Sequence, residues 1–91
     1  MIGILLASHG EMANGMVSSV HLLFGEQIDQ LDSLCLNGDS SLDEFDQQLR
    51  NKVQTLDSGQ GVVILTDLLF GTPCNRCAFI MDSNVKVLCG M

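Results

Sequence analysis

Short apolar runs alternate along the chain with stretches in which apolar residues recur at helical spacing. The runs have the length and continuity of buried strands, and they lie at 2–7, 31–36, 61–65 and 85–89. The helical spacing forms two stripes, one of Met12, Met16, Val20 and Leu23 and one of Leu42, Phe45, Leu49, Val53 and Leu56. Continuous apolar strands that alternate with helices predict an α/β fold, with a parallel sheet and helices on its faces.

Capping residues set the bounds of the second and third predicted helices. Ser41 and Glu44 have the spacing of a capping box, in which Ser41 accepts from a backbone N–H and Glu44 reaches back. Thr72 and Pro73 read as an N-cap followed by proline at the first helical position. This third helix is expected to reach about Met81.

Composition and charge narrow the class of protein. Ninety-one residues with 46% apolar content suit one globular domain, expected over 1–91. No apolar run approaches the ~20 residues of a membrane span, and the run at 2–7 lacks the basic flank of a signal peptide. A cytoplasmic protein without membrane insertion is therefore expected, with its four cysteines reduced. A net charge of −7 with four scattered basic residues argues against nucleic acid as a partner.

Two polar residues that follow predicted strands are candidates for chemistry. His9 follows the first strand, and Asp67 follows the third. Ligands gather beyond the carboxyl ends of parallel strands, so the imidazole and the carboxylate can meet if these strands are neighbours. A carboxylate bonded to one ring nitrogen fixes the tautomer and leaves the other nitrogen as a nucleophile. Position alone favours neither this pair nor a loop histidine beside a turn aspartate.

A predicted helix start beside Asp67 adds an anion site. The segment 71–75 places free backbone N–H groups and the positive end of a helix dipole near the pair. The Thr72 hydroxyl can cap the helix or donate to a phosphate oxygen. A nucleophilic histidine, an orienting carboxylate and an anion cradle together suit phosphoryl transfer, which needs mainly positioning and charge stabilisation. The cysteine and histidine spacing matches no structural zinc site, and neither a metal nor a cofactor is expected.

Several short segments, spread in order over nearly the whole chain, have the pattern of a known protein family. They are 4–10 (ILLASHG), 65–68 (LTDL), 71–75 (GTPCN) and 87–90 (VLCG), with Gly15 and 25–26 between the first two. In these segments the chain resembles the mannose-type IIA domains of the bacterial phosphoenolpyruvate-dependent sugar phosphotransferase system (PTS). The resemblance implies a doubly wound fold and a phosphoryl carrier, a phosphotransferase component that is loaded by the phosphocarrier protein HPr and passes its phosphoryl group to a IIB domain. It implies that His9 is phosphorylated, that Asp67 orients it, and that the phosphoryl oxygens are held by Gly71, Thr72, Cys74, Asn75 and Ser8.

The sequence departs from the family pattern at three places. Phe70 stands where a glycine is usual before Thr-Pro, and Arg76 replaces a small apolar residue. Arg76 is expected to be solvated, or else to contact a phosphate or a partner. Family domains continue beyond Gly90 with a helix and a strand that is exchanged within a homodimer. The resemblance therefore predicts a C-terminally truncated domain that leaves apolar helix or sheet surface exposed.

Alternatives remain open beside sugar uptake. A regulatory IIA-like domain, or the phosphoryl-donor subunit of a dihydroxyacetone kinase, would use the same histidine. Cys74 and Cys77 form a CxxC at a predicted helix start, a pattern that also occurs in redox dithiols. A serine hydrolase is not supported, because Ser8 adjoins His9 and no G-x-S-x-G elbow is present. His21, inside the first predicted helix, is expected at the surface or at its boundary.

Overall fold

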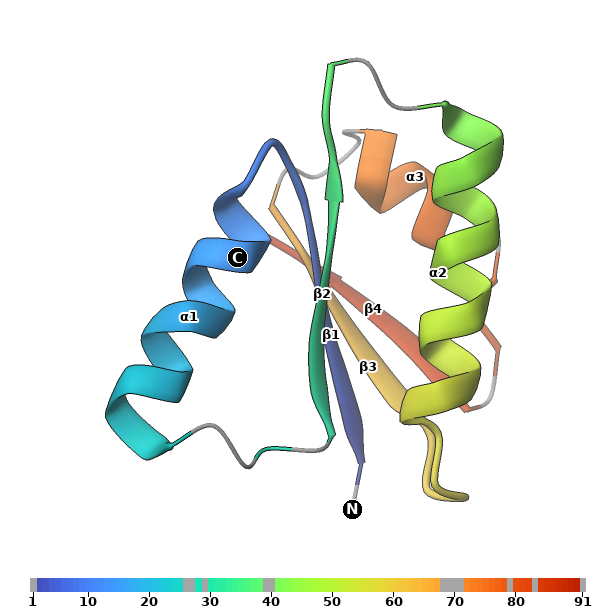
Figure 1. Ribbon diagram of the computed structural model, residues 1–91. Coiled ribbons are helices and arrows are strands. Elements are labelled where there is room, and N and C mark those ends of the chain that lie inside the picture. The colour runs from blue at the N-terminus through green and yellow to red at the C-terminus, as the bar shows by residue number, and fades with distance from the viewer. Residues whose placement is uncertain are drawn as a thin grey trace.

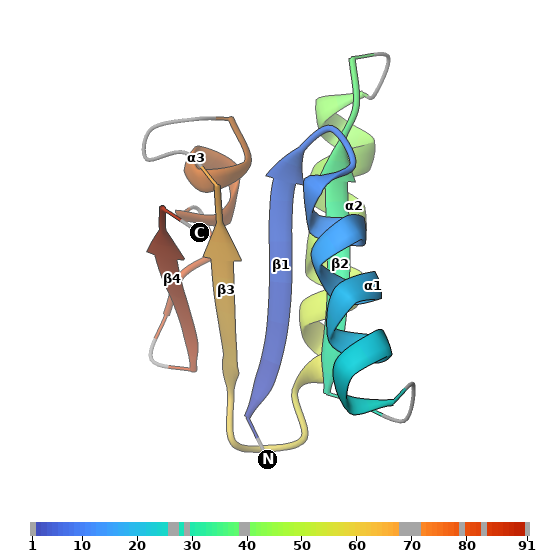
Figure 2. The same ribbon diagram turned by 90° about the vertical axis from the view of Figure 1, so that its left-hand side faces the viewer.

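The fold is a four-stranded parallel sheet in the order β2-β1-β3-β4 (Figure 2). The computed structural model describes residues 2–25, 28, 30–38, 41–67, 72–78, 80–82 and 84–90, with the backbone alone for Cys74. The elements are β1 (Gly3–His9), α1 (Met12–Phe24), β2 (Leu31–Leu36), α2 (Leu42–Leu56), β3 (Val62–Thr66), α3 (Thr72–Ala78) and β4 (Val85–Cys89).

The helices cover both faces of the sheet. Helix α1 lies on one face, and α2 and α3 lie on the other (Figure 1). The predicted fold class, an α/β domain with a parallel sheet and helices on both faces, is therefore confirmed. None of the helices in the described part of the chain is long and apolar enough to cross a membrane.

The main core lies between the sheet and α2. Leu5 of β1 and Ile64 of β3 are fully buried there against Leu49 of α2. The predicted stripe of α2 is confirmed except at its first residue: Phe45, Leu49, Val53 and Leu56 are buried, whereas Leu42 is 40% exposed. The predicted N-cap is also present, because Ser41 Oγ accepts from the Glu44 N–H at 3.5 Å.

Helix α1 packs through a different face from the one its apolar stripe indicates. Ala13 is its fully buried residue, whereas Met12, Met16 and Leu23 of the stripe are 43%, 36% and 75% exposed. The spacing identified the helix correctly, but the sheet packs beside the stripe because a small residue lets the helix approach closely. The expected exposure of apolar helix and sheet surface is confirmed at the end of α1 and at Leu88 of β4.

Helix α3 is shorter than predicted and ends at Ala78. The next backbone bond runs from the Ile80 N–H to the carbonyl of Cys77, three residues back, at 3.1 Å. This spacing belongs to a tight turn rather than to a continuing α-helix. Asp82 Oδ1 then accepts from the Val85 N–H at 2.9 Å, which directs the chain into β4. Local side-chain bonding therefore overrides the helical spacing.

Candidate functional site

The candidate site lies where the chain leaves the two central strands in opposite directions. Strand β1 ends at His9 and leads into α1, while β3 ends at Thr66 and leads toward α3 on the other face. Because β1 and β3 are paired neighbours, their carboxyl ends form the switch point at which open parallel sheets bind ligands. Asp67 directly follows β3 and so stands beside His9.

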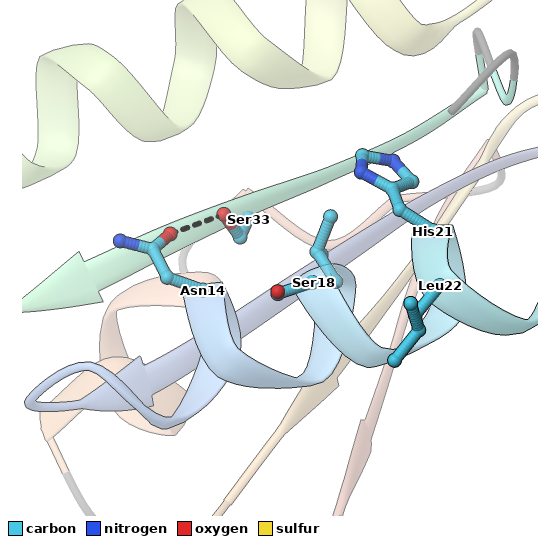
Figure 3. A pocket seen from close by; sticks show the side chains of 6 residues that line it. Asn14, Ser18, His21, Leu22 and Ser33 are labelled. Carbon is cyan, nitrogen blue, oxygen red and sulfur yellow. Dashed lines mark hydrogen bonds between the residues drawn. The ribbon is translucent and has the colours of Figure 1, made fainter. Parts of the chain in front are cut away.

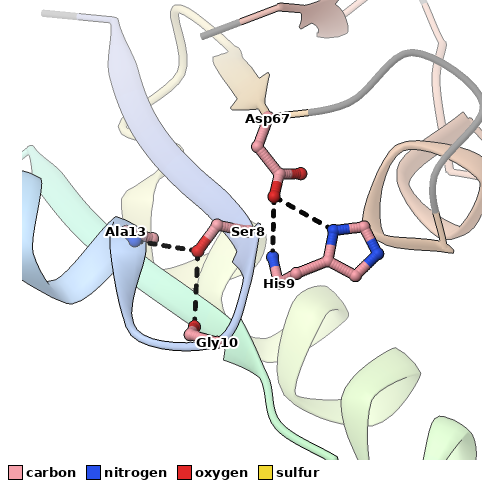
Figure 4. A network of polar contacts seen from close by, with 5 residues as sticks. All are labelled: Ser8, His9, Gly10, Ala13 and Asp67. Atoms are coloured by element: carbon pink, nitrogen blue, oxygen red, sulfur yellow. Dashed lines mark hydrogen bonds and ion pairs between the residues drawn. The ribbon is translucent and has the colours of Figure 1, made fainter.

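One carboxylate oxygen of Asp67 holds His9 at two atoms. Asp67 Oδ2 lies 3.0 Å from His9 Nδ1 and accepts from the His9 backbone N–H at 2.9 Å (Figure 4). The predicted meeting of imidazole and carboxylate is confirmed. Since a carboxylate only accepts, this contact places the ring proton on Nδ1 and leaves the lone pair of a neutral ring on Nε2.

The two partners differ in their contact with solvent. The His9 side chain is 42% exposed, whereas that of Asp67 is 11% exposed. The carboxylate is thus sheltered, where its charge acts more strongly on the ring than it would in water. The other ring nitrogen points away from the carboxylate (Figure 4), on a side chain that is partly exposed. The pair can therefore orient and polarise a nucleophilic imidazole.

The Ser8 side chain is not placed where it could bind a phosphoryl group beside His9. It is fully buried, and its Oγ accepts from the Ala13 N–H at 2.8 Å at the start of α1. The same hydroxyl donates to the Gly10 carbonyl at 3.4 Å (Figure 4). The expectation that Ser8 holds phosphoryl oxygens is not supported by this placement, because the side chain is engaged inside the protein on the α1 side.

Thr72 shares a hollow with His9. The hollow has a volume of about 430 Å³ and is lined by His9, Gly10, Leu36, Asn37, Gly38, Leu42 and Thr72. Thr72, the first residue of α3, is partly buried there, and Asn75 is exposed one turn later. Gly71 and Phe70 lie outside the described residues, as does the Cys74 side chain. A phosphate-binding role for Gly71, Thr72, Cys74 and Asn75 stays a prediction.

Arg76 is paired within the protein. Its Nη1 lies 3.5 Å from Asp46 Oδ2, which joins α3 to α2. The expected fully solvated side chain is not found, because Arg76 is paired and 29% exposed, whereas its expected contact with a phosphate or a partner stays a prediction. Both side chains are more than a quarter exposed, so the pair adds at most about 1 kcal/mol to stability. Its effect is to steady the helix that carries Thr72.

The cysteines do not form the redox pair that the CxxC spacing suggests. Cys77 is a free thiol and fully buried. Burial, with a smaller contribution from the Asp46 carboxylate, raises the pKa of the Cys77 thiol to about 12. A thiol that keeps its proton is a poor nucleophile. The prediction of reduced thiols is confirmed for Cys77 and Cys35 but is wrong for Cys89, which is disulfide-bonded.

The raised pKa of Cys77 predicts a loss of stability in strong alkali. Below pH 9 the thiol is protonated whether the chain is folded or unfolded, and from about 9 to about 12 only the unfolded chain releases this proton. The free energy of unfolding should therefore decrease across that range. Urea titrations of the wild type and Cys77→Ala between pH 8 and 10.5 measure it. The wild type should lose more stability than the variant over this range, and equal losses would contradict the assignment to Cys77.

His21 lies apart from the candidate site. It is partly buried on α1 and lines a hollow of about 500 Å³ beside β2, with Asn14, Ser18 and Ser33 (Figure 3). Ser33 Oγ donates to Asn14 Oδ1 at 2.5 Å in this hollow. The expected boundary position of His21 is confirmed. Within the described part of the chain, no group of three or more His, Cys, Asp or Glu side chains could hold a metal ion.

A comparison with protein-family models identifies the family of this chain. The model described as the PTS system fructose IIA component, EIIA-man, matches residues 3–91. The chain belongs to this EIIA-man family. The resemblance seen in the sequence is therefore confirmed. Within the family match lie both His9 and Asp67, the pair that the fold brings together.

Solved structures of EIIA-man relatives share this fold. The PTS IIA protein associated with the fucose utilization operon from Streptococcus pneumoniae is 36% identical, with a TM-score of 0.86. The phosphotransferase system component EIIA from Streptococcus agalactiae is 29% identical, also with a TM-score of 0.86. The matches cover 97% and 100% of this chain but 68% and 70% of those proteins. This chain thus spans about two thirds of the length of these two relatives.

More distant structures extend the likeness of fold alone. The mannose/sorbose specific IIA subunit from Enterococcus faecalis is 23% identical over 99% of this chain and 68% of its own, with a TM-score of 0.84. A sigma-54 interaction domain protein from the same organism is 20% identical over the same shares, with a TM-score of 0.77. At these identities the comparison shows the fold alone, which a sugar-specific IIA subunit and a sigma-54 interaction domain protein share.

Proposed function

We propose that this chain is a phosphoryl carrier of a sugar phosphotransferase system. It accepts a phosphoryl group from phospho-HPr on His9 and passes it to a IIB domain in the cytoplasm, acting as a single phosphocarrier domain over 1–91. The observation that carries the proposal is the double hold of Asp67 Oδ2 on the ring and backbone of His9. A surface histidine gains little stability from such a hold, whereas a nucleophile gains orientation.

The transfer is a displacement at phosphorus. The Nε2 lone pair of His9 forms a bond to the phosphorus while the bond between phosphorus and the donor atom of HPr breaks, and the electron pair of that bond returns to the donor atom. Asp67 keeps the Nδ1 proton in place and stabilises the positive charge that develops on the ring. Transfer to IIB reverses these steps with a new acceptor, so one site serves both partners.

The phosphoryl oxygens need donors on the open side of His9. We propose that the Thr72 hydroxyl, together with backbone groups of Gly71, Cys74 and Asn75, supplies them. The shared hollow of His9 and Thr72 supports this placement, since a group attached to Nε2 extends on the solvent side of the ring. The Arg76–Asp46 pair holds α3 to α2 and thereby steadies the position of Thr72.

Intact-mass spectrometry tests the proposal. The protein is incubated with phosphoenolpyruvate, enzyme I and HPr, and each component is omitted in turn. We expect one phosphoryl addition that needs all three components and is lost in acid, as expected for a phosphohistidine. Adding a IIB domain should then discharge the protein. A folded protein that stays unmodified under these conditions would exclude the carrier role.

The acceptor decides between sugar uptake and the alternatives. A regulatory domain would be phosphorylated without passing the group to IIB, and a dihydroxyacetone kinase subunit would discharge to the kinase instead. The homodimer implied by the resemblance stays a prediction, and sedimentation over a range of protein concentrations tests it.

A further inference from the structure

The Ser8 hydroxyl performs a capping role that the residue at the helix boundary does not fill. The first turn of a helix leaves backbone N–H groups without helical partners, and a side chain of the N-cap residue usually accepts from one of them. In α1 the N-cap is Glu11, whose side chain makes no capping bond. Ser8 accepts from the Ala13 N–H at 2.8 Å instead, from inside strand β1.

This bond joins α1 to the strand end that carries His9. Ser8 and Ala13 are both fully buried, so their hydrogen bond is shielded from water. A buried N–H that loses its acceptor is costly, which makes this bond a strong constraint on the chain between them. The segment between them contains His9 and Gly10. The Gly10 carbonyl oxygen also accepts a hydrogen bond from Ser8 Oγ at 3.4 Å.

Hydrogen bonds from α1, from the residue after β3 and from β2 thus hold the main chain around His9. Successive strand residues point to opposite faces, so Ser8 faces α1, whereas His9 faces the hollow that Leu42 and Thr72 also line. From the end of the neighbouring strand β3, Asp67 accepts from the His9 backbone N–H. At the strand end Gly10, with φ of 59°, donates its N–H to the Leu36 carbonyl at 2.8 Å. The Ser8 bonds restrain the peptide group that Asp67 also holds.

We propose that Ser8 is a positioning residue for His9. Its hydroxyl fixes the strand end against α1, so that the imidazole meets Asp67 with Nδ1 toward the carboxylate and Nε2 outward. This inference rests on the proposed function of His9 and assigns Ser8 no contact with the phosphoryl group. Without the hydroxyl the His9 main chain gains freedom, and the ring spends less time in the reactive orientation.

Three substitutions separate positioning from mere stability. Ser8→Ala removes the acceptor and the donor with little change in volume, and Ser8→Thr restores a hydroxyl. Ser19→Ala is the control, because Ser19 Oγ donates to the Gly15 carbonyl on the exposed side of the same helix. If Ser8→Ala does not fold, Ser8→Cys takes its place, since a thiol fills the same space but accepts hydrogen bonds weakly.

The first readout is the tautomer of His9, measured by ¹⁵N NMR of the imidazole at a pH at which the ring is neutral. We expect the wild type, Ser19→Ala and Ser8→Thr to show the Nδ1–H form, and Ser8→Ala to show averaging toward the Nε2–H form. This readout does not require phosphorylation. It therefore tests the positioning even if the wild type accepts no phosphoryl group, a result that would reject the proposed function alone.

The second readout is phosphoryl acceptance from phospho-HPr. We expect Ser8→Ala to lower kcat by about tenfold with little change in KM, because orientation is lost while the docking surface is kept. Ser8→Thr should recover most of the rate. A Ser8→Ala protein with the tautomer and the kcat of Ser19→Ala would overturn the proposal, as would a loss of kcat that Ser8→Thr does not restore.

Discussion

His9→Ala is expected to abolish phosphoryl acceptance while the protein remains folded. The substitution removes Nε2, the nitrogen that the Asp67 contact leaves with a lone pair. The 42% exposed imidazole contributes little to the core, so the free energy of unfolding should change by less than about 1 kcal/mol. The backbone N–H that donates to Asp67 is retained in the variant. Intact mass in the full phosphoryl-transfer mixture measures acceptance, and urea titration measures stability.

His21→Ala is the matched control for this variant. His21 is the other histidine of the chain, and it lies toward the opposite end of α1 from the loop after His9. It should be phosphorylated as fully as the wild type. If His9→Ala still acquires an acid-labile phosphoryl group, a different residue carries it and the site is wrongly assigned. If both variants fail, the loss is not specific to His9.

Asp67→Asn is expected to slow phosphoryl transfer by about 10²-fold, the lower range for loss of one preorganised electrostatic partner of the transition state. The amide oxygen can still accept from the His9 N–H, so the strand end should stay in place. The negative charge is lost, however, and the amide no longer stabilises the positive ring of the transition state. The effect should appear in kcat more than in KM, because the carboxylate is largely buried and lies at the Nδ1 edge of the ring.

Rapid-quench measurement of a single turnover from phospho-HPr gives this rate directly. Asp32→Asn serves as the control, because Asp32 also forms an ion pair, with Lys52 at 3.0 Å, but lies at the other end of the strands. This variant should transfer at the wild-type rate. A wild-type rate in Asp67→Asn would remove the carboxylate from the mechanism and leave it a purely structural partner of the strand end.

The sequence was sufficient to predict the four strands, the second helix and the meeting of His9 with Asp67. Apolar runs of strand length lie at each of the four strands, and the stripe ending at Leu56 is the buried face of α2. His9 and Asp67 could be paired in advance because both follow strands whose carboxyl ends share one edge. These inferences rest on the spacing of apolar residues and on the order of strands and helices, both of which can be read from the sequence.

What sequence reasoning missed depends on contacts between distant segments. The stripe of α1 specifies a helix but not the side on which the sheet lies, and small Ala13 turned out to be the contact. The partner of Arg76 is Asp46 of another helix, which no local pattern could indicate. The phosphate-binding role of Ser8 came only from the family resemblance, which does not show how its side chain is bonded. A capping residue missing just before α1 was the available signal that a more distant hydroxyl fills this position.

On the proposed function, the exposure of the His9 imidazole bears on how long the phosphorylated protein keeps its phosphoryl group. With 42% of the His9 side chain exposed, a group on Nε2 meets the partner protein and bulk water through the same opening. On the proposed function, its lifetime then depends on the intrinsic rate of P–N hydrolysis rather than on shielding. Transfer to an acceptor protein therefore competes with this hydrolysis. The efficiency of the whole relay should therefore fall when the acceptor becomes scarce, even though every site on the carrier remains intact.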